Sequence, residues 1–134
     1  MMAKKLLIIW ISVGLFSAAC GPIGPGTYRL ATTSATPGAG YLAGLAGVLE
    51  GQVNSDGSAC LWVEGESGAR TNLIWPGGYA AVDKPLRVID ALGKTVATVG
   101  ETVELQGGDS AGVQAEGCSS ISKSWLVAKV ISAK

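Results

Sequence analysis

The sequence predicts an all-β domain, and three observations lead to that prediction. Glycine makes up 20 of the 134 residues, about twice its usual share of roughly 7%, which disfavours a helical bundle. After residue 47, short runs rich in valine, threonine and leucine alternate with clusters of turn-forming residues, as in β-sandwiches and β-barrels. No apolar stripe at helical spacing extends over three turns in this region. We therefore expect one small domain of five to seven short strands over residues 48–134.

Residues 1–19 have the layout of a secretory signal. Lys4 and Lys5 form a short basic region, an apolar stretch runs from Leu6 to Phe16, and small residues follow as far as Ala19. As a helix, the uncharged stretch from Leu6 to Ala19 would be about 21 Å long, whereas the hydrocarbon core of a bilayer is roughly 30 Å thick. A cleaved signal peptide is therefore favoured over a permanent membrane span.

The segment Ser17-Ala18-Ala19-Cys20-Gly21 resembles the lipobox of bacterial lipoproteins, in which the cysteine is acylated and becomes the new N-terminus. Small residues precede Cys20 as in that family, whereas Ser17 stands where the family usually has leucine. The resemblance implies a lipid anchor such as palmitate at Cys20. It also implies a place in the cell envelope, on the outer membrane or on the outer face of the cytoplasmic membrane. Soluble secretion and an uncleaved anchor are the alternatives.

Residues 20–47 are expected to form the lipidated cysteine and a flexible, disordered tether. The stretch 21–47 contains seven glycines, three prolines and a single charged residue, and no regular apolar period survives these breaks. As a random coil its ends would lie about 25–31 Å apart, which would lift the domain clear of the lipid headgroups. Docking of Tyr41, Leu42 and Leu45 on the domain is the alternative.

The strands expected after the tether come from runs that lie between turn clusters. Residues 102–106 alternate strictly, with Val103 and Leu105 on one face, as in a half-exposed strand. Residues 125–131 are apolar on both faces, which indicates a strand covered on both sides. The expected strands are Val48–Val53, Ala59–Glu64, Arg70–Trp75, Leu86–Asp90, Thr95–Val99, Thr102–Gln106 and Trp125–Ser132.

Two segments resemble a known fold family. Residues 99–108 look like the Gly-acidic-x-Val-x-Leu-x-Gly strand of small OB-like barrels, and residues 73–78 are similar to segments of small bacterial lipoproteins that carry such barrels. The resemblance covers roughly residues 48–134. It implies a small OB-like β-barrel, and it implies no particular activity.

The cysteine count predicts one disulfide. An acylated Cys20 leaves Cys60 and Cys118, an even number in an oxidising compartment. A redox-active pair would normally have Cys-x-x-Cys spacing, whereas these two residues are 58 positions apart. A structural bridge between Cys60 and Cys118 is therefore expected.

The composition argues against enzymatic activity and against nucleic-acid binding. The chain has no histidine, and no Gly-x-Ser-x-Gly motif presents a nucleophilic serine. Asp56, Glu64, Glu66 and Glu116 fall at turns or loop edges with no metal-ligand spacing, so we expect neither a metal nor another cofactor. Residues 48–134 carry seven basic and ten acidic side chains, which is the wrong balance for a nucleic-acid groove.

We therefore expect an exported, lipid-anchored protein with a non-enzymatic binding or structural accessory role, whose partners are the membrane and an envelope protein or a glycan. The alternative is a small-ligand or glycan-binding module in which Trp75 and Tyr79 flank the turn at residues 76–78 as an aromatic platform. Against it, alternation places Leu73 and Trp75 on one face, which favours a core position for Trp75. Trp62 and Trp125 are expected to fill the core.

Overall fold

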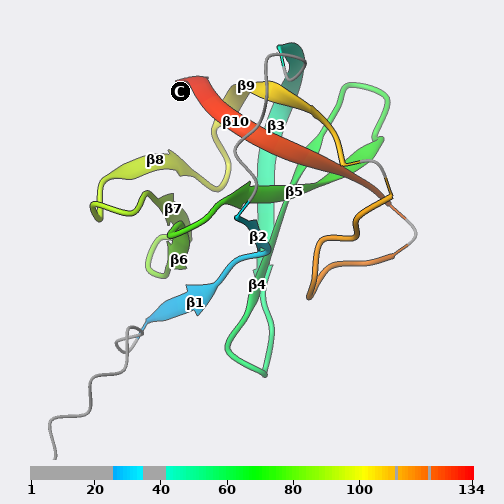
Figure 1. Ribbon diagram of the computed structural model, residues 1–134. Coiled ribbons are helices and arrows are strands. Elements are labelled where there is room, and N and C mark those ends of the chain that lie inside the picture. The colour runs from blue at the N-terminus through cyan, green and yellow to red at the C-terminus, as the bar shows by residue number, and fades with distance from the viewer. Residues whose placement is uncertain (1–25, 35–41, 111, 121) are drawn as a thin grey trace, which may run out of the picture.

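The computed structural model describes residues 26–34, 42–110, 112–120 and 122–134, and these residues form an all-β fold (Figure 1). The all-β class predicted from the sequence is confirmed. The described residues contain no helix that could cross a membrane. Their strands are β1 (Thr27–Arg29), β2 (Thr32–Thr33), β3 (Ala43–Val53), β4 (Ala59–Glu64), β5 (Arg70–Pro76), β6 (Ala80–Val82), β7 (Arg87–Ile89), β8 (Thr95–Thr98), β9 (Thr102–Asp109) and β10 (Lys123–Ala133).

The larger sheet has six strands in the order β10-β9-β3-β4-β5-β2. Strand β3 is long enough to pair antiparallel with β9 along its first half and with β4 along its second half. Strand β10 pairs antiparallel with β9 and also parallel with β5, where Lys123 lies opposite Thr71 and Leu126 opposite Ile74. The pairings thus run from β3 through β4, β5, β10 and β9 back to β3.

The smaller sheet is antiparallel, with the strand order β1-β6-β7-β8. Three of its strands lie in the chain between β5 and β9, and the fourth, β1, precedes the larger sheet. Figure 1 shows this sheet beside one end of the larger one. Both sheets contribute to one apolar core, in which Leu73 and Trp75 of β5 belong to the same cluster as Ala81 and Val88 of the smaller sheet.

Alternation along the strands separates the core from the opposite face of the larger sheet. Ala59, Leu61 and Val63 of β4 belong to the core cluster, so Cys60 and Trp62 lie on the other face. The same alternation on β5 puts Leu73 and Trp75 in the core, and Asn72 faces away from it. This outer face of β4 and β5 carries the polar groups described below.

The structure corrects the tether prediction for residues 26–34 and 42–47. Strand β1 pairs with β6, β2 pairs with β5, and β3 begins at Ala43, well before the expected start. One glycine that indicated a tether has a different use here, because a Cβ added at Gly47 would overlap the backbone carbonyl of Glu64 on the neighbouring strand. Leu45 packs against the core, as the docking alternative required, whereas Leu42 is exposed.

The N-terminal predictions lie outside the described residues. These are the signal peptide at 1–19, the lipidated Cys20, the remaining tether residues at 21–25 and 35–41, and the docking of Tyr41.

Candidate functional site

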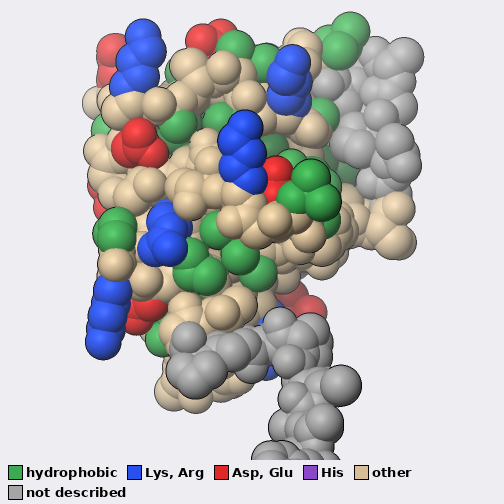
Figure 2. Space-filling view, turned by 90° about the vertical axis from the view of Figure 1, so that its left-hand side faces the viewer, with side chains coloured by type: hydrophobic (Ala, Val, Ile, Leu, Met, Phe, Trp, Pro, Cys, Tyr) green, Lys and Arg blue, Asp and Glu red, His purple; other side chains and the backbone are tan. Residues whose placement is uncertain are grey.

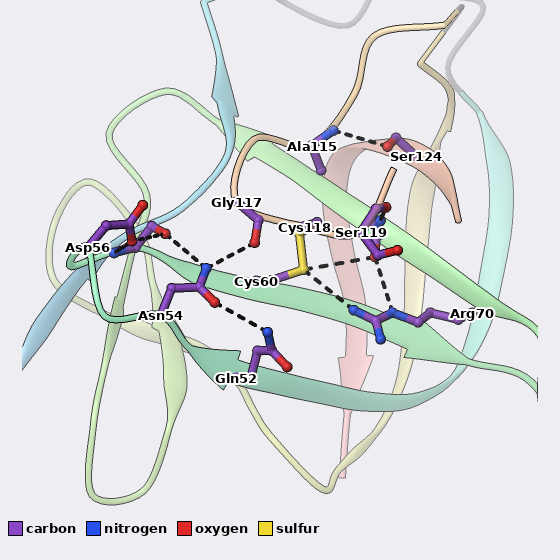
Figure 3. The surroundings of a disulfide bond; sticks show 12 residues. Gln52, Asn54, Asp56, Cys60, Arg70, Ala115, Gly117, Cys118, Ser119 and Ser124 are labelled. Carbon is purple, nitrogen blue, oxygen red and sulfur yellow. Dashed lines mark hydrogen bonds between the residues drawn. A yellow bond between two sulfur atoms is a disulfide. The ribbon is translucent and has the colours of Figure 1, made fainter. Parts of the chain in front are cut away.

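The predicted disulfide joins Cys60 of β4 to Cys118 of the β9–β10 loop (residues 110–122), as Figure 3 shows. The two Cα atoms are 5.1 Å apart, within the range of about 4.4–6.8 Å that disulfides require. Cys60 is fully buried although it lies on the outer face of β4. The β9–β10 loop therefore covers this part of the sheet.

The turn between β3 and β4 forms a second attachment for this loop. The Asn54 side-chain amide donates a hydrogen bond of 2.9 Å to the Ser58 hydroxyl and another of 2.9 Å to the carbonyl oxygen of Gly117. Gly117 precedes Cys118, so this contact and the disulfide hold adjacent residues of the loop. An added Cβ at Gly117 would lie 2.9 Å from the Ser58 hydroxyl oxygen, which makes glycine the residue that fits at this close approach.

Asp56 orders the same turn. Its Oδ1 atom accepts hydrogen bonds from the Ser58 hydroxyl at 2.6 Å and from the Ser58 backbone N–H at 2.9 Å. These bonds, first the hydroxyl and then the N–H, hold the pKa of the Asp56 carboxyl below its ordinary value, and the charge of Arg29 acts in the same direction. The two hydrogen bonds to Ser58 therefore hold the ionised Asp56 carboxylate in place and order the turn.

A buried amide fixes the loop on β5. Asn72 is fully buried, and its amide nitrogen donates to the carbonyl oxygen of Ser119 at 2.8 Å. Its Oδ1 atom accepts a hydrogen bond of 3.4 Å from Nε of Arg70. The Arg70 guanidinium also lies 3.6 Å from the centre of the Trp62 ring, a cation–π contact on the outer face of β4.

The start of β10 provides the last attachment. The Ala115 N–H donates to the Ser124 hydroxyl at 3.1 Å, and both residues are buried. Together with the disulfide and the bonds from Asn54 and Asn72, this contact holds the β9–β10 loop against three strands of the larger sheet. These polar groups are paired with one another. We call the set formed by the disulfide, Asn54, Asn72, Ser124 and the loop residues that they contact the clamp, because it holds the loop on the sheet.

A small polar hollow adjoins the clamp. Its lining includes Arg29, Asp56, Ser58 and Glu116, and its volume is about 150 Å³. In the described part of the chain, no three His, Cys, Asp or Glu side chains are grouped so that they could hold a metal ion. The Arg29 guanidinium donates to the carbonyl oxygen of Asp56 at 3.1 Å, which ties β1 to the clamp through this hollow.

The structure contradicts the aromatic platform at Trp75 and Tyr79. Trp75 is 0% exposed, and its ring stacks on that of Tyr79 with 6.1 Å between the ring centres. Tyr79 is half-buried and packs against the core cluster. Trp75 lies inside the molecule because alternation along β5 turns it inward with Leu73, so Trp75 has no face free for a ligand.

The other two tryptophans of the domain occupy different places. Trp125 packs against the core, as expected, and an added Cβ at Gly107 would lie 2.8 Å from its indole nitrogen. Trp62 is half-buried under Arg70 on the outer face, so the prediction that it fills the core is wrong.

Comparisons with protein-family models, with curated proteins and with solved structures found no match to this chain. The function must therefore be argued from the residues themselves. Sequence reasoning predicted the cysteine pair but missed the roles of Asn54, Asn72 and Arg70. Alternation along β5 could have placed Arg70 and Asn72 on the same face, whereas nothing local could indicate that residues 115–119 would cover them.

Proposed function

We propose that this chain is an exported lipoprotein of the bacterial cell envelope, anchored through acylated Cys20. The observation that carries the proposal is the Cys60–Cys118 disulfide. Such bonds persist in oxidising compartments and are rare in the cytosol, so a structural disulfide supports export. It also uses both cysteines of the domain and leaves Cys20 as the remaining cysteine of the chain.

The N-terminal residues carry the features of an export signal. The basic region, the apolar stretch and the small residues before Cys20 match the secretory layout and the lipobox resemblance described above. A single acyl chain binds membranes only marginally, whereas the two or three chains of a mature lipoprotein hold it essentially permanently. An anchor of this kind would keep the domain at the outer membrane or at the outer face of the cytoplasmic membrane.

We further propose that β3, β4, β5, β10 and β9 form an OB-like barrel. Two observations support it: the cycle of pairings that returns to β3, and the parallel pairing of β10 with β5. An OB fold is a five-stranded barrel whose ligands usually bind across its second and third strands. In this chain β4 and β5 correspond to the second and third strands of the OB fold, and the β9–β10 loop, held by the disulfide, covers their outer face at Cys60 and Asn72.

The role that fits this arrangement is non-enzymatic, as a structural or protein-binding accessory in the envelope. The clamp pairs its own polar groups, and the β9–β10 loop covers Cys60 of β4 and Asn72 of β5 on the outer face. Cross-linking in intact envelopes, followed by identification of captured proteins, would identify the partner. Recovery of the same partner with wild-type chain and its loss with a clamp variant would support the accessory role.

The test of the anchor is expression of the full chain in a bacterial host, followed by membrane fractionation and intact-mass analysis. We expect a membrane-bound chain that begins at Cys20 and carries the added mass of the acyl groups. Cys20→Ala should be released or left unprocessed, whereas Ser17→Leu, which restores the usual lipobox residue, should be processed at least as well as wild type. An unmodified chain that begins at residue 20 or later would overturn the proposal.

A further inference from the structure

The linkage between Cys20 and the domain is short, and this limits where the domain can lie. Strand β1 begins at Thr27, only seven residues after Cys20. Even a fully extended chain spans at most about 3.3–3.6 Å per residue, so Thr27 can lie no more than about 25 Å from Cys20. If Cys20 is acylated, as the proposed function requires, Thr27 can lie no more than about 25 Å from the lipidated residue, so β1 is the part of the domain whose distance from the bilayer is most limited.

A hollow that contains two basic residues lies beside β1. The backbone N–H of Asp83 donates to the carbonyl oxygen of Gly26 at 2.9 Å, so the turn after β6 adjoins the first described residue. Tyr28 of β1 and the basic residues Lys84 and Arg87 line the hollow at this point. Figure 2 views the molecule from the side of the smaller sheet and shows Lys and Arg side chains on this surface, with Asp and Glu side chains among them.

The two cations of this hollow differ in how they are fixed. Lys84 is exposed. The Arg87 guanidinium donates to the carbonyl oxygens of Asp83 at 3.3 Å and Pro85 at 3.1 Å, which fixes its position beside the turn. The Asp83 carboxylate, the one anion of the hollow, accepts hydrogen bonds from the Tyr28 hydroxyl and from the Lys84 N–H.

The charge of the hollow differs in sign from that of the rest of the domain. Two basic and one acidic side chains line it, so its net charge is +1. The other described residues carry six basic and nine acidic side chains, a net charge of −3. An anionic surface therefore attracts the residues that line this hollow, whereas the other described residues carry a net negative charge.

We propose that the hollow formed by Gly26, Tyr28, Asp83, Lys84 and Arg87 faces the bilayer and contacts anionic lipid headgroups through Lys84 and Arg87. The inference rests on the proposed lipid anchor, which brings the hollow within reach of the membrane. The attraction of basic side chains to anionic lipid acts over about one Debye length, roughly 8 Å at physiological ionic strength. The anchor supplies the proximity, and the two cations select which side of the domain faces the lipid.

The test uses the acylated full chain in vesicles of phosphatidylcholine alone or with about one third phosphatidylglycerol. A water-soluble amine reagent labels the lysines, and mass spectrometry compares Lys84 with Lys123, which begins β10 outside the hollow. In the vesicles with phosphatidylglycerol we expect labelling of Lys84 to fall about fivefold, the factor that corresponds to about one favourable charge interaction with anionic lipid. Labelling of Lys123 should not change, and about 1 M salt should restore labelling of Lys84 because the Debye length falls to about 3 Å.

Arg87→Gln and Lys123→Gln form a matched pair of variants. Arg87→Gln should weaken the protection of Lys84 in anionic vesicles, and Lys123→Gln should leave it unchanged. Equal labelling of Lys84 in the two kinds of vesicle, with the chain floating with both, overturns the inference and leaves the anchor intact. A chain that does not float with vesicles overturns the anchor, and the inference falls with it.

Discussion

Trp62 and Trp75 show how the position of a residue on a strand decides its role. The two residues lie on neighbouring strands, β4 and β5, and face opposite sides of the sheet. Trp75 is fully buried in the core, whereas Trp62 lies on the outer face with Arg70 over its ring. Side chains alternate along a strand with a period of two. A tryptophan beside a turn is therefore a candidate ligand platform only where this alternation places its side chain on the outer face of the sheet.

Asp56 should make the stability of the fold depend on pH. Its pKa in the folded protein lies below the ordinary value of 3.8, because the Ser58 hydroxyl and N–H donate to the ionised carboxylate. A lowered folded pKa means that the carboxylate stabilises the protein above its unfolded pKa and loses this effect as the pH falls through the folded pKa. We expect wild type to be more stable than Asp56→Asn near neutral pH, and the difference to shrink as the pH falls below 3.8.

Urea unfolding of both proteins between neutral pH and strongly acidic pH measures this difference. Glu66→Gln, in the exposed turn after β4, is the control, and its midpoint should follow that of wild type. If the midpoints of Asp56→Asn and wild type stay equally far apart at every pH, the hydrogen bonds of Asp56 do not favour its ionised form.

At the scale of elements, the disulfide and the β9–β10 loop act as one unit, and Cys118→Ser should show this. The model of loop-closure entropy gives roughly 4 kcal/mol for a closed loop of 58 residues, and native-state strain reduces this value. For a domain of this size, such a loss lowers the melting temperature by more than about ten degrees. Thermal unfolding followed by circular dichroism measures the shift, and the Cys20→Ala chain should melt with wild type. A shift below about three degrees would show that the hydrogen bonds from Asn54 and Asn72 suffice without the bridge.

The strands that the sequence predicted best are those that lie between clear clusters of turn-forming residues. Ala59–Glu64 coincides with β4, and the expected Arg70–Trp75 differs from β5 by one residue. Strand β9 extends past its predicted end because Gly107 packs closely against the backbone of Leu126 on β10. Strands β1, β2 and β6 are two or three residues long, too short for a local pattern, and depend on their partners in the sheets.

In the whole molecule, the clamp depends on contacts between residues that are far apart in the sequence. The pairing of Cys60 with Cys118 followed from the cysteine count and the compartment, because few partners were possible. The contacts of Asn72 with Ser119 and of Asn54 with Gly117 join segments 47 and 63 residues apart, and no local pattern encodes such meetings. The same holds for the smaller sheet, whose first strand comes from the region expected to be a tether.

The two sheets should unfold together, because one core joins them. Val88 of β7 is fully buried in the cluster that contains Trp75 of β5. Val88→Ala removes two methyl groups and leaves a cavity, which should cost about 2 kcal/mol of unfolding free energy. Tryptophan fluorescence reports on the larger sheet, where the domain's tryptophans lie, and far-UV circular dichroism reports on both sheets. We expect the fluorescence and circular dichroism of the variant to change in one urea transition, with the same midpoint, which lies below that of wild type.

Leu92→Ala is the control, because Leu92 is 93% exposed in the turn between β7 and β8 and its loss should change the unfolding free energy by less than about 0.5 kcal/mol. An early change in circular dichroism with unchanged fluorescence would show that the smaller sheet unfolds alone, and that the core residues it contributes are not needed to keep Trp75 buried.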